Sequence, residues 1–417
     1  MNSLDSPASA GTCRFCQTPL THSFCDLGMS PLSNAYLTRE QLGSKEPFYP
    51  LHAYVCDTCR LVQLEEFEAP ETIFSEYAYF SSYSESWLAH AQRYCEHITS
   101  RLGLDSRSLV IEIASNDGYL LQYFHERGIP VLGIEPARNV ARAARERGVP
   151  TIEKFFGTAT AEELVHEGQR PDLLVGNNVL AHVPDLNDFI QGLKRLLKSC
   201  GVITLEFPHL WRLIEGMQFD TIYHEHFSYF SFGTVERIFA AHGLVIFDVE
   251  ELPTHGGSLR IYVRHKEDES RPVGDAVAAV HRQEAQSGLD RLERYVGFEE
   301  NVREVKRQLL IFLIECKRAG KSVVGYGAPA KGNTLLNYCG IRTDFLDYTV
   351  DLSPYKQGRY LPGTHIPIHH PNVIRQTRPD YVLVLPWNLK DEIMSQMAYI
   401  REWGGKFVIP IPEVEVL

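Results

Sequence analysis

The chain has 417 residues, of which 44% are hydrophobic and 23% charged, and its formal net charge is −12. This length predicts about three domains of roughly 150 residues each, and the composition excludes collagen-like and low-complexity proteins. The acidic balance argues against a nucleic-acid-binding protein, which needs a basic surface. No apolar run approaches the roughly 18 residues of a membrane helix, and residues 1–12 do not resemble a signal peptide. We therefore expect a cytoplasmic protein without a membrane partner.

The first motif in the chain consists of two C-x2-C pairs, Cys13 with Cys16 and Cys56 with Cys59. A tight turn inside each pair lets both thiolates reach one tetrahedral metal ion. In a reducing compartment this spacing is more typical of metal ligands than of disulfides. Four thiolates leave no open coordination position, so we predict a structural zinc ion in a module spanning 1–67. The long spacer between the pairs is expected to form a small sheet or to cross the module.

Residues 68–275 alternate short apolar runs with helical stretches. The runs lie at 108–114, 131–136, 172–179 and 201–208. Short strands that alternate with helices are typical of a parallel α/β sheet. A later strand is expected at 255–265, followed by a charged linker to residue 275. We therefore predict a central Rossmann-like domain in this region.

A long helical pattern fills 276–319, and a second strand–turn–helix region follows it. Its strands are expected at 322–327, 347–352, 379–387 and 406–412. Residues 276–417 are therefore predicted to form a C-terminal Rossmann-like α/β domain. The predicted fold class is α/β, with the zinc-binding module preceding the two sheets.

A polar turn, A-S-N-D-G-Y, follows the first strand of the central domain. It places Glu112, Asn116, Asp117 and Gly118 at the carboxyl end of the sheet, where ligands bind in such folds. Glu135 ends the second strand, where a carboxylate can accept hydrogen bonds from both hydroxyls of a ribose. These residues predict a nucleoside site. The alternative is a simple helix cap made by Asn116 or Asp117.

The same turn lacks the G-x-G-x-x-G pattern that holds a pyrophosphate on a helix N-terminus. A nucleoside without phosphates, such as S-adenosylmethionine (SAM), therefore fits better than NAD. Asn177, at the end of a later strand, is assigned to the same cofactor site. His182 follows it in N-N-V-L-A-H-V-P-D and is expected on the rim where a substrate would lie.

The densest titratable block is F-D-T-I-Y-H-E-H-F-S-Y-F-S, at 219–231. A near-neutral imidazole is suited to removing a carbon-bound proton, and a tyrosine hydroxyl can donate to an oxyanion. An extended segment would put Tyr223 and Glu225 on one face, whereas a helical turn would bring Tyr223 beside His226. A metal site made by His224, Glu225 and His226 is the alternative use of this block.

Two further polar motifs are expected to join this block. Tyr77 lies in E-Y-A-Y-F-S-S-Y-S, which links the zinc module to the central sheet and is expected to close over the site. Arg260 lies in H-G-G-S-L-R and is assigned to a phosphate of the substrate. The alternative for the second motif is a polar sequence that only stabilises a turn.

The C-terminal domain begins with V-V-G-Y-G-A-P-A-K-G-N-T, a strand, a glycine turn and a helix. Lys331 in this motif can offer a point charge to a phosphate. Lys356 follows the next strand, and Asn388, in P-W-N, ends a later strand and could hold a base or a sugar. We therefore predict a phosphorylated ligand bound between domains. The alternative is a second scaffold with a vacant cleft.

The order of these motifs carries a resemblance. It runs from the cysteine pairs through Y-x-Y-x-S-S, E-I-A-S-N-D-G, N-x-L-x-H-x-P, Y-x-E-H-F and H-G-G to G-Y-G-x-x-x-K. This order is similar to that of the three-domain, zinc-containing, SAM-dependent sugar C-methyltransferases. Members act on nucleotide-linked 4-keto-6-deoxy sugars in deoxysugar biosynthesis, best known at C-3 and in some cases at C-5.

The resemblance implies roles for the motif residues. SAM would bind against Glu112, Asn116, Asp117 and Glu135, and zinc on the four cysteines would be structural. His226 would be the general base, and Tyr77, His182, Tyr223 and Glu225 would surround the sugar. The C-terminal domain would help to hold the nucleotide diphosphate, with a thymidine carrier favoured and guanosine or cytidine carriers as alternatives. One departure is His224, where some members carry an acidic residue.

Other functional classes remain open at this point. A nicotinamide-dependent enzyme could use G-Y-G-A-P-A-K together with Asp351. A zinc-containing RNA methyltransferase would need a basic stripe that the acidic chain does not show. A binding protein without catalytic activity is disfavoured by the Y-H-E-H block.

Overall fold

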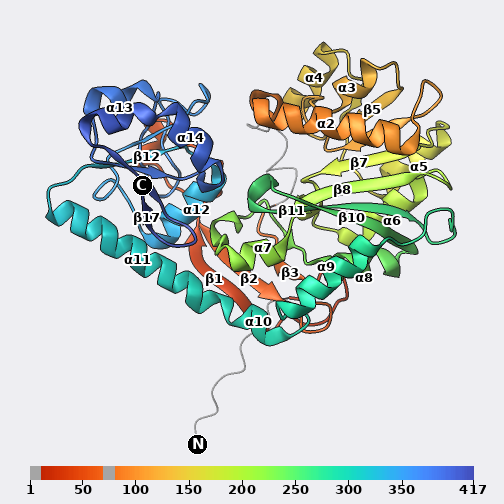
Figure 1. Cartoon of the computed structure of the whole chain (residues 1–417), viewed down its shortest axis with the longest axis horizontal. Coiled ribbons are helices and arrows are strands. Elements are labelled where there is room, and N and C mark those ends of the chain that lie inside the picture. Colours follow the sequence, from red (N-terminus) through yellow and green to blue (C-terminus); the bar gives the residue numbers. More distant parts are fainter. Residues whose placement is uncertain (1–10, 69–79) are drawn as a thin grey trace, which may run out of the picture.

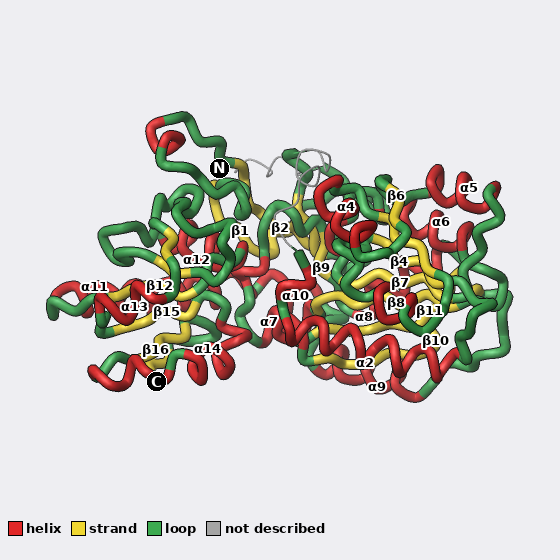
Figure 2. Tube along the Cα trace, turned by 90° about the horizontal axis from the view of Figure 1, so that it is seen from above, coloured by secondary structure: helices red, strands yellow, loops and turns green. Residues whose placement is uncertain are grey.

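A computed structural model describes residues 11–68 and 80–417. Within them the strands form three sheets of four, seven and six strands. Figure 1 shows the two larger sheets on opposite sides of the molecule, with β1 and β2 between them and helix α11 running along one edge of the assembly. The same two lobes separate in the view from above in Figure 2. Tyr77 lies outside the described residues.

The N-terminal sheet is antiparallel and has the order β1-β2-β3-β9. Its strands are β1 (His22–Ser30), β2 (Tyr49–Val55), β3 (Val62–Leu64) and β9 (Ser228–Tyr229). The spacer between the cysteine pairs therefore forms most of a small sheet, which was one of the two predicted outcomes. The last strand comes from the central region, where Ser228 lies opposite Gln63 and Tyr229 lies opposite Val62.

The central sheet has the order β10-β11-β8-β7-β4-β5-β6. Its parallel strands are β4 (Val110–Ile113), β5 (Val131–Ile134), β6 (Thr151–Ile152), β7 (Leu173–Asn177) and β8 (Val202–Pro208). Strand β11 (Ser258–His265) runs antiparallel between β8 and β10 (Leu244–Leu252). The predicted strands of this domain are all present, and β6 and β10 are additional.

Helices cover both faces of the central sheet. One face packs against helices α2 (Glu85–Leu102), α3 (Leu121–His125) and α4 (Arg138–Glu146). The other packs against helices α5 (Thr158–His166), α6 (Leu186–Leu196) and α8 (Phe232–Ala241). Successive side chains of β4 enter opposite cores, since Val110 belongs to the first and Ile111 to the second. Strands buried on both faces explain the continuous apolar runs in the sequence.

The C-terminal sheet has the order β14-β13-β12-β15-β16-β17. Five of its strands are parallel: β12 (Val323–Tyr326), β13 (Thr349–Val350), β14 (Ile368–His369), β15 (Tyr381–Val384) and β16 (Lys406–Ile409). Strand β17 (Glu415–Val416) is antiparallel to β16. The helices of this domain are α12 (Ala330–Cys339), α13 (Asn372–Thr377) and α14 (Lys390–Gln396). The predicted α/β fold is therefore confirmed in both sheet domains.

The segment predicted as one long helix forms three helices, α9 (Asp275–Gln286), α10 (Leu292–Val296) and α11 (Phe298–Arg318). Gly288, in the left-handed region with φ of 78°, ends the first, and Gly297 separates the other two. Helix α9 packs on α8 and β10, and its Val277 and Val280 belong to the central core. That core therefore continues beyond residue 275, and the predicted domain limits remain predictions.

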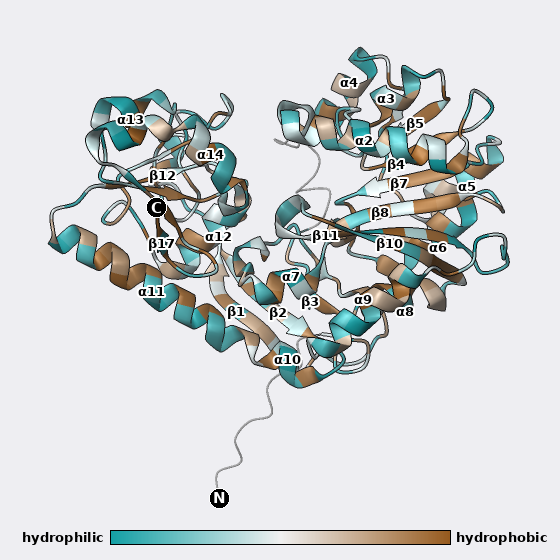
Figure 3. Ribbon diagram, in the orientation of Figure 1, coloured by the Kyte–Doolittle hydropathy of each residue, from teal (hydrophilic) through white to brown (hydrophobic). Residues whose placement is uncertain are grey.

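The N-terminal module joins the two larger domains. Its cysteine turns share a hydrophobic core with the central sheet. Its strands share another with α11 and the C-terminal sheet. Figure 3 shows the resulting pattern, in which hydrophobic strands lie inside and hydrophilic helix faces lie outside. Among the described residues, no helix is long and apolar enough to span a membrane.

Short elements connect these layers. They are helix α7 (Leu210–Glu215) and the 3-10 helices η1 (Glu40–Gly43), η2 (Ser81–Tyr83), η3 (Leu180–His182), η4 (Phe219–Thr221), η5 (Thr254–Gly256), η6 (Trp387–Leu389) and η7 (Ala398–Trp403). The element η4 begins the titratable block found in the sequence. The elements η3 and η5 follow the central strands β7 and β10, so that sheet determines where they lie.

Glu284 of α9 offers a test of this packing. Its buried carboxylate accepts hydrogen bonds from the backbone N–H groups of Phe232 and Gly233 and from His209 Nε2 at 2.7 Å. Glu284→Ala would leave these donors unsatisfied, so we expect the free energy of unfolding to fall by roughly 3 kcal/mol in urea denaturation. The exposed Gln286→Ala is the matched control on the same helix, with an expected change below about 0.5 kcal/mol. Equal stability of the two variants would contradict this account.

Candidate active site and metal centre

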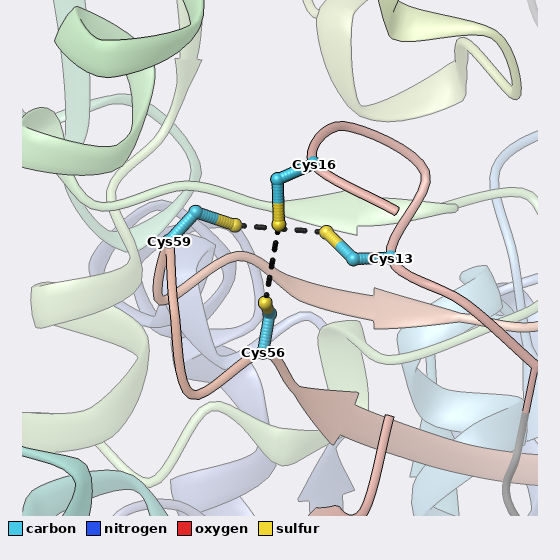
Figure 4. Close-up of side chains that lie close together, drawn as sticks. All are labelled: Cys13, Cys16, Cys56 and Cys59. Carbon is cyan, nitrogen blue, oxygen red and sulfur yellow. Dashed lines mark hydrogen bonds between the residues drawn. The ribbon is translucent and has the colours of Figure 1, made fainter. Parts of the chain in front are cut away.

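The four N-terminal cysteines converge on one point (Figure 4). Their Sγ atoms all lie within 4.8 Å of one another, with 3.6 Å between Cys13 and Cys59 and 3.5 Å between Cys16 and Cys56. A tetrahedral zinc ion with bonds of about 2.3 Å requires sulfur–sulfur distances of roughly 3.8 Å. The donor set and its spacing therefore fit a structural zinc ion with no open position.

Both cysteine pairs use the same turn. The backbone N–H of Gln17 donates to the Cys13 carbonyl at 2.9 Å, and that of Arg60 donates to the Cys56 carbonyl at 2.9 Å. Gln17 and Arg60 are left-handed, with φ of 62° and 63°. The repeated turn explains why two residues separate the cysteines in each pair.

The metal centre is anchored to the central domain. The carbonyl of Cys59 accepts hydrogen bonds from Thr234 Oγ1 at 3.0 Å and Arg237 Nη1 at 2.9 Å, both on α8. Arg14, between the first two cysteines, donates to the Pro184 carbonyl at 2.7 Å. A metal bound here therefore stabilises the position of the module as well as its own loops.

The polar turn after β4 has an unusual backbone. Ala114, Asn116 and Gly118 have φ values of 54°, 49° and 77°, all left-handed. A Cβ atom at Gly118 would lie 3.0 Å from Val149 Cγ2, so the position needs glycine for space as well as for conformation. Strain of this kind concentrates at functional sites.

Buried carboxylates line this turn. Glu135 accepts hydrogen bonds from the N–H groups of Asn116 and Ala137, both at 2.9 Å, and burial raises its pKa to about 7. Among the described residues, neither carboxylate oxygen of Glu112 has a hydrogen-bond partner, nor has Oδ1 of Asp117. Such groups are expected to find partners in a ligand that carries donors. The hydroxyls and the ammonium group of SAM are donors of that kind.

The titratable block forms a tight turn. The N–H of His226 donates to the Tyr223 carbonyl at 2.8 Å, and the two rings lie 4.1 Å apart between centroids. Of the two conformations left open by the sequence, the turned one is present. His224 points away from this pair, with its Nε2 3.1 Å from the Pro50 carbonyl.

The orientation of His224 bears on the alternative metal site. Across residues 11–68 and 80–417, the four cysteines are the only group of metal-ligand side chains that come together. The alternative metal site of His224, Glu225 and His226 is therefore not formed in the described residues, because the imidazoles of His224 and His226 turn to different partners. Of the two uses considered for this block, acid–base chemistry is the one that the geometry supports.

The protonation of His226 follows from its contacts. Its Nδ1 lies 2.9 Å from the Thr221 carbonyl, which can only accept, so Nδ1 carries the proton and Nε2 has the lone pair. Burial lowers the pKa of His226 well below its usual value; the hydrogen bond to the Thr221 carbonyl opposes this shift, and the charge of Lys331 adds to it. The ring is therefore neutral at physiological pH and able to accept a proton.

His182 is held in the same way. Its Nδ1 donates to the Glu225 carbonyl at 2.7 Å, and its ring lies 4.7 Å from that of His226. Burial lowers the pKa of His182 to about 4, so this ring is neutral too. The predicted position of His182 beside the titratable block is thus observed.

Both neighbouring parts of the chain hold the block from outside the central domain. From the N-terminal module, Asn34 Nδ2 donates to Glu225 Oε1 at 2.6 Å. From α12, Thr334 Oγ1 donates to the Ile222 carbonyl at 3.1 Å. Burial raises the pKa of Glu225 to about 7, so this carboxyl group titrates near neutrality.

The C-terminal domain brings two predicted residues to the same place. Lys331 Nζ donates to Asn388 Oδ1 at 2.9 Å and lies 4.7 Å from the centroid of the Trp387 ring. Trp387 Nε1 donates to Asp220 Oδ2 at 2.7 Å, in η4 at the start of the block. Burial lowers the pKa of Lys331, and the nearby charge of Asp220 opposes that shift. Lys331 therefore provides a partly desolvated cation beside His226.

Lys356 lies farther along the same domain. Its Nζ donates to the Ala328 carbonyl at 3.0 Å and pairs with Asp351 Oδ2 at 3.3 Å. Tyr36 of the N-terminal module donates to the same carbonyl at 2.6 Å. Asp351 also accepts hydrogen bonds from the N–H groups of Ala328 and Ser353, both at 2.8 Å.

Arg260 differs from the other predicted substrate contacts. It is 4% exposed, and its guanidinium pairs with Glu206 at 2.6 Å and with Glu250 at 3.1 Å. This placement favours the turn-stabilising alternative over a contact with phosphate. Asn34 was not found from the sequence, since it belongs to no spaced motif, and Asp220 was given no role although it lies in the titratable block.

Together the fold and these sites define a SAM-dependent methyltransferase with a zinc-binding module. Family models match three successive parts of the chain: "Putative zinc binding domain" at 13–74, "Methyltransferase domain" at 87–249 and "C-methyltransferase C-terminal domain" at 253–412. The chain is 35% identical to C-methyltransferase NovU of Streptomyces niveus over 97% of its own length and 96% of that protein. The chain therefore belongs to this family of C-methyltransferases.

More distant matches cover less than half of this chain. A ubiquinone biosynthesis O-methyltransferase of Bartonella tribocorum is 28% identical over 22% of this chain and 38% of its own length. The crystal structure of the PH0226 protein from Pyrococcus horikoshii OT3 matches 48% of this chain and 100% of its own, with a TM-score of 0.36 and 17% identity.

The metal centre leads to a direct prediction. Cys56→Ser removes one thiolate from the tetrahedral set, so the purified protein should lose its zinc in elemental analysis and melt at a lower temperature. Cys200→Ser is the matched control, because Cys200 is exposed and lies outside the cluster. Full zinc content in the Cys56 variant would contradict the proposed ligand set.

Proposed function

We propose that this C-methyltransferase transfers the methyl group of SAM to C-3 of a nucleotide-linked 4-keto-6-deoxy sugar, as a step of deoxysugar biosynthesis. Methylation at C-5 of a similar sugar is the second candidate. The observation that carries the proposal is the neutral imidazole of His226, whose Nε2 lone pair lies beside a cation from another domain. Methyl transfer to carbon needs a base for a carbon-bound proton, and a neighbouring ketone makes that proton acidic.

The proposed chemistry begins with His226. Its Nε2 accepts the proton from the carbon next to the ketone, and the electron pair of that C–H bond moves onto the carbonyl oxygen to form an enolate. SAM supplies the electrophilic methyl group that the carbon nucleophile takes, which leaves S-adenosylhomocysteine. Tyr223 and Glu225 adjoin the base in the proposed site, and Tyr77, which lies outside the described residues, is proposed to join them. Catalysis then consists of proton transfer, positioning and electrostatics.

We propose that SAM binds at the carboxyl end of the central sheet. Each oxygen of Glu135 retains a lone pair for a ribose hydroxyl, after one hydrogen bond to a backbone N–H. The unpartnered oxygens of Glu112 and Asp117 are suited to the remaining donors of the cofactor. Gly118 and Asn177 complete the proposed cofactor site, Gly118 by keeping the turn free of a side chain.

The nucleotide part of the substrate is assigned to the C-terminal domain. Lys331 and Lys356 would meet the diphosphate, and Asn388, now bonded to Lys331, would meet the base or the sugar. A thymidine diphosphate carrier is favoured, and guanosine and cytidine diphosphate carriers are the alternatives. Both lysines are half-buried cations in a chain that is acidic as a whole.

Incubation of the protein with SAM and a panel of 4-keto-6-deoxy nucleotide sugars tests the proposal. We expect one sugar to gain a methyl group in mass spectrometry, at a carbon that NMR then identifies.

His226→Asn should keep its affinity for SAM and lose methyl transfer by about 10³-fold, as expected for a general base. His224→Asn is the matched control, and its rate should stay within about threefold of the wild type. If no sugar gains a methyl group while SAM still binds, the sugar class is wrong.

The pH dependence offers a second test. A cation beside an imidazole disfavours the protonated ring, so Lys331→Met should raise the pKa of His226 and move the acidic limb of kcat/KM toward higher pH. The loss of a phosphate contact should also lower kcat/KM by roughly tenfold to a hundredfold. Lys356→Met is the control, because this lysine pairs with Asp351 and should weaken binding without moving the limb. If the acidic limb of kcat/KM does not move in the Lys331 variant, the charge of Lys331 does not control the pKa of His226.

A further inference from the structure

A third imidazole, that of His255, belongs to the same site. It lies in η5, in the H-G-G turn between β10 and β11. The carbonyl of the next residue, Gly256, accepts a hydrogen bond at 2.9 Å from Gln218 Nε2, directly before the titratable block. A Cβ atom at Gly256 would lie 2.8 Å from the Trp387 ring, whose Nε1 donates to Asp220 of the block. His255 therefore lies next to the block, although the proposed function gives it no role.

The contacts of His255 place it at the carboxyl end of the central sheet. Asn178, the first residue after β7, approaches the ring with its amide Nδ2 at 3.1 Å from His255 Nε2. On another side lies the Trp87 ring of α2, with 5.4 Å between centroids. The ring therefore lies between the end of β7 and the helix that opens the methyltransferase region.

The hydrogen-bond pattern separates His255 from the other two imidazoles. In His182 and His226 the protonated Nδ1 is already bonded to a backbone carbonyl, so neither neutral ring has a second proton to donate. With the amide of Asn178 oriented as it is in the structure, its Nδ2 donates to Nε2 of His255, which assigns the proton of this ring to Nδ1. Burial lowers the pKa of His255 to about 4, which keeps the ring neutral. Of the three, His255 alone offers an N–H donor whose partner is not a backbone carbonyl.

The backbone at His255 is strained. Its φ and ψ are 54° and 22°, a left-handed conformation in which most residues with a side chain are disfavoured. The next two residues, Gly256 and Gly257, have φ of 90° and 119°, and a Cβ atom at either would lie within 2.8 Å of another side chain. Thr254 and Gln218 secure the turn through hydrogen bonds of 2.8 Å to Glu206 and 2.9 Å to the Gly256 carbonyl. The surrounding contacts thus hold His255 in a strained conformation, and strain of this kind is typical of functional sites.

We propose that His255 is a further catalytic residue, whose Nδ1–H group donates a hydrogen bond to the substrate oxygen that becomes negative when His226 removes the carbon-bound proton. This inference rests on the proposed function. The proton moves from carbon to Nε2 of His226, the C–H electron pair becomes the enolate, and His255 keeps its own proton throughout. A neutral donor stabilises the oxyanion without neutralising it, as in other oxyanion holes.

The test uses the strain at this position. Glycine prefers the left-handed conformation, so His255→Gly should leave the melting temperature unchanged or raise it. If the ring donates to the oxyanion, the same variant should lose about 10²- to 10³-fold in kcat, while its affinity for SAM and its KM for the sugar change less than threefold. The carbon-bound hydrogen of the substrate should exchange for deuterium in D2O when S-adenosylhomocysteine replaces SAM. NMR measures this exchange, and its rate in the variant should fall in parallel with kcat.

Two further variants sharpen the comparison. His365→Gly is the matched control, since His365 is also left-handed, with φ of 59°, and its Nε2 pairs with Glu46 at 3.0 Å, outside the proposed active site. It should keep kcat within twofold. His255→Asn tolerates the same backbone and carries a donor amide, so we expect it to recover part of the rate lost in the glycine variant.

The outcomes separate this inference from the function on which it rests. An active wild-type protein together with an unchanged kcat in His255→Gly would overturn the role of His255 and leave the proposed function standing. A lowered melting temperature, or a loss confined to KM, would assign His255 a structural role and also overturn the inference. A wild-type protein that methylates no sugar of the panel would overturn both.

Discussion

The pairing of β3 with β9 is the contact on which the arrangement of the site depends. It is a short antiparallel ladder, Val62 with Tyr229 and Gln63 with Ser228, yet it joins the zinc-binding sheet to the chain directly after the titratable block. The N–H of Leu64 extends it to the Phe227 carbonyl at 3.0 Å, one residue from His226. The cysteine turns hold one end of this sheet against α8. A structural metal is thereby connected through backbone hydrogen bonds to the proposed base.

The same block is where all three parts of the chain meet. The central domain contributes His182, the N-terminal module contributes Asn34, and the C-terminal domain contributes Thr334 and Lys331. The bonds from His182, Asn34 and Thr334 satisfy polar groups of the block that would otherwise be costly to leave unpaired. The proposed active site is therefore a junction, and none of the three parts contains it alone. A two-lobed architecture of this kind suits a methyltransferase, which brings a nucleoside cofactor and a second substrate together.

Local patterns in the sequence predicted much of this protein. The cysteine spacing predicted the zinc centre, because two intervening residues form a turn that brings both thiolates of a pair to one metal ion. Apolar runs located the parallel strands, since strands buried on both faces consist of consecutive hydrophobic residues. The break at Gly288 was missed because the apolar periodicity of 276–319 continues across it. Contacts such as Asn34 with Glu225 join residues far apart in the chain, and no spacing rule reports them. The tautomers of the imidazoles depend on such contacts and could be assigned only from the structure.

The origin of β9 has a consequence for synthesis on the ribosome. The N-terminal module emerges first, but its sheet lacks its last strand until residues 228–229 have left the exit tunnel. During that interval the outer edge of β3 presents unpaired backbone groups, which are a template for pairing with another nascent chain. The strand has only three residues, Val62–Leu64. A short edge limits such pairing, so its length serves the growing chain as well as the finished enzyme.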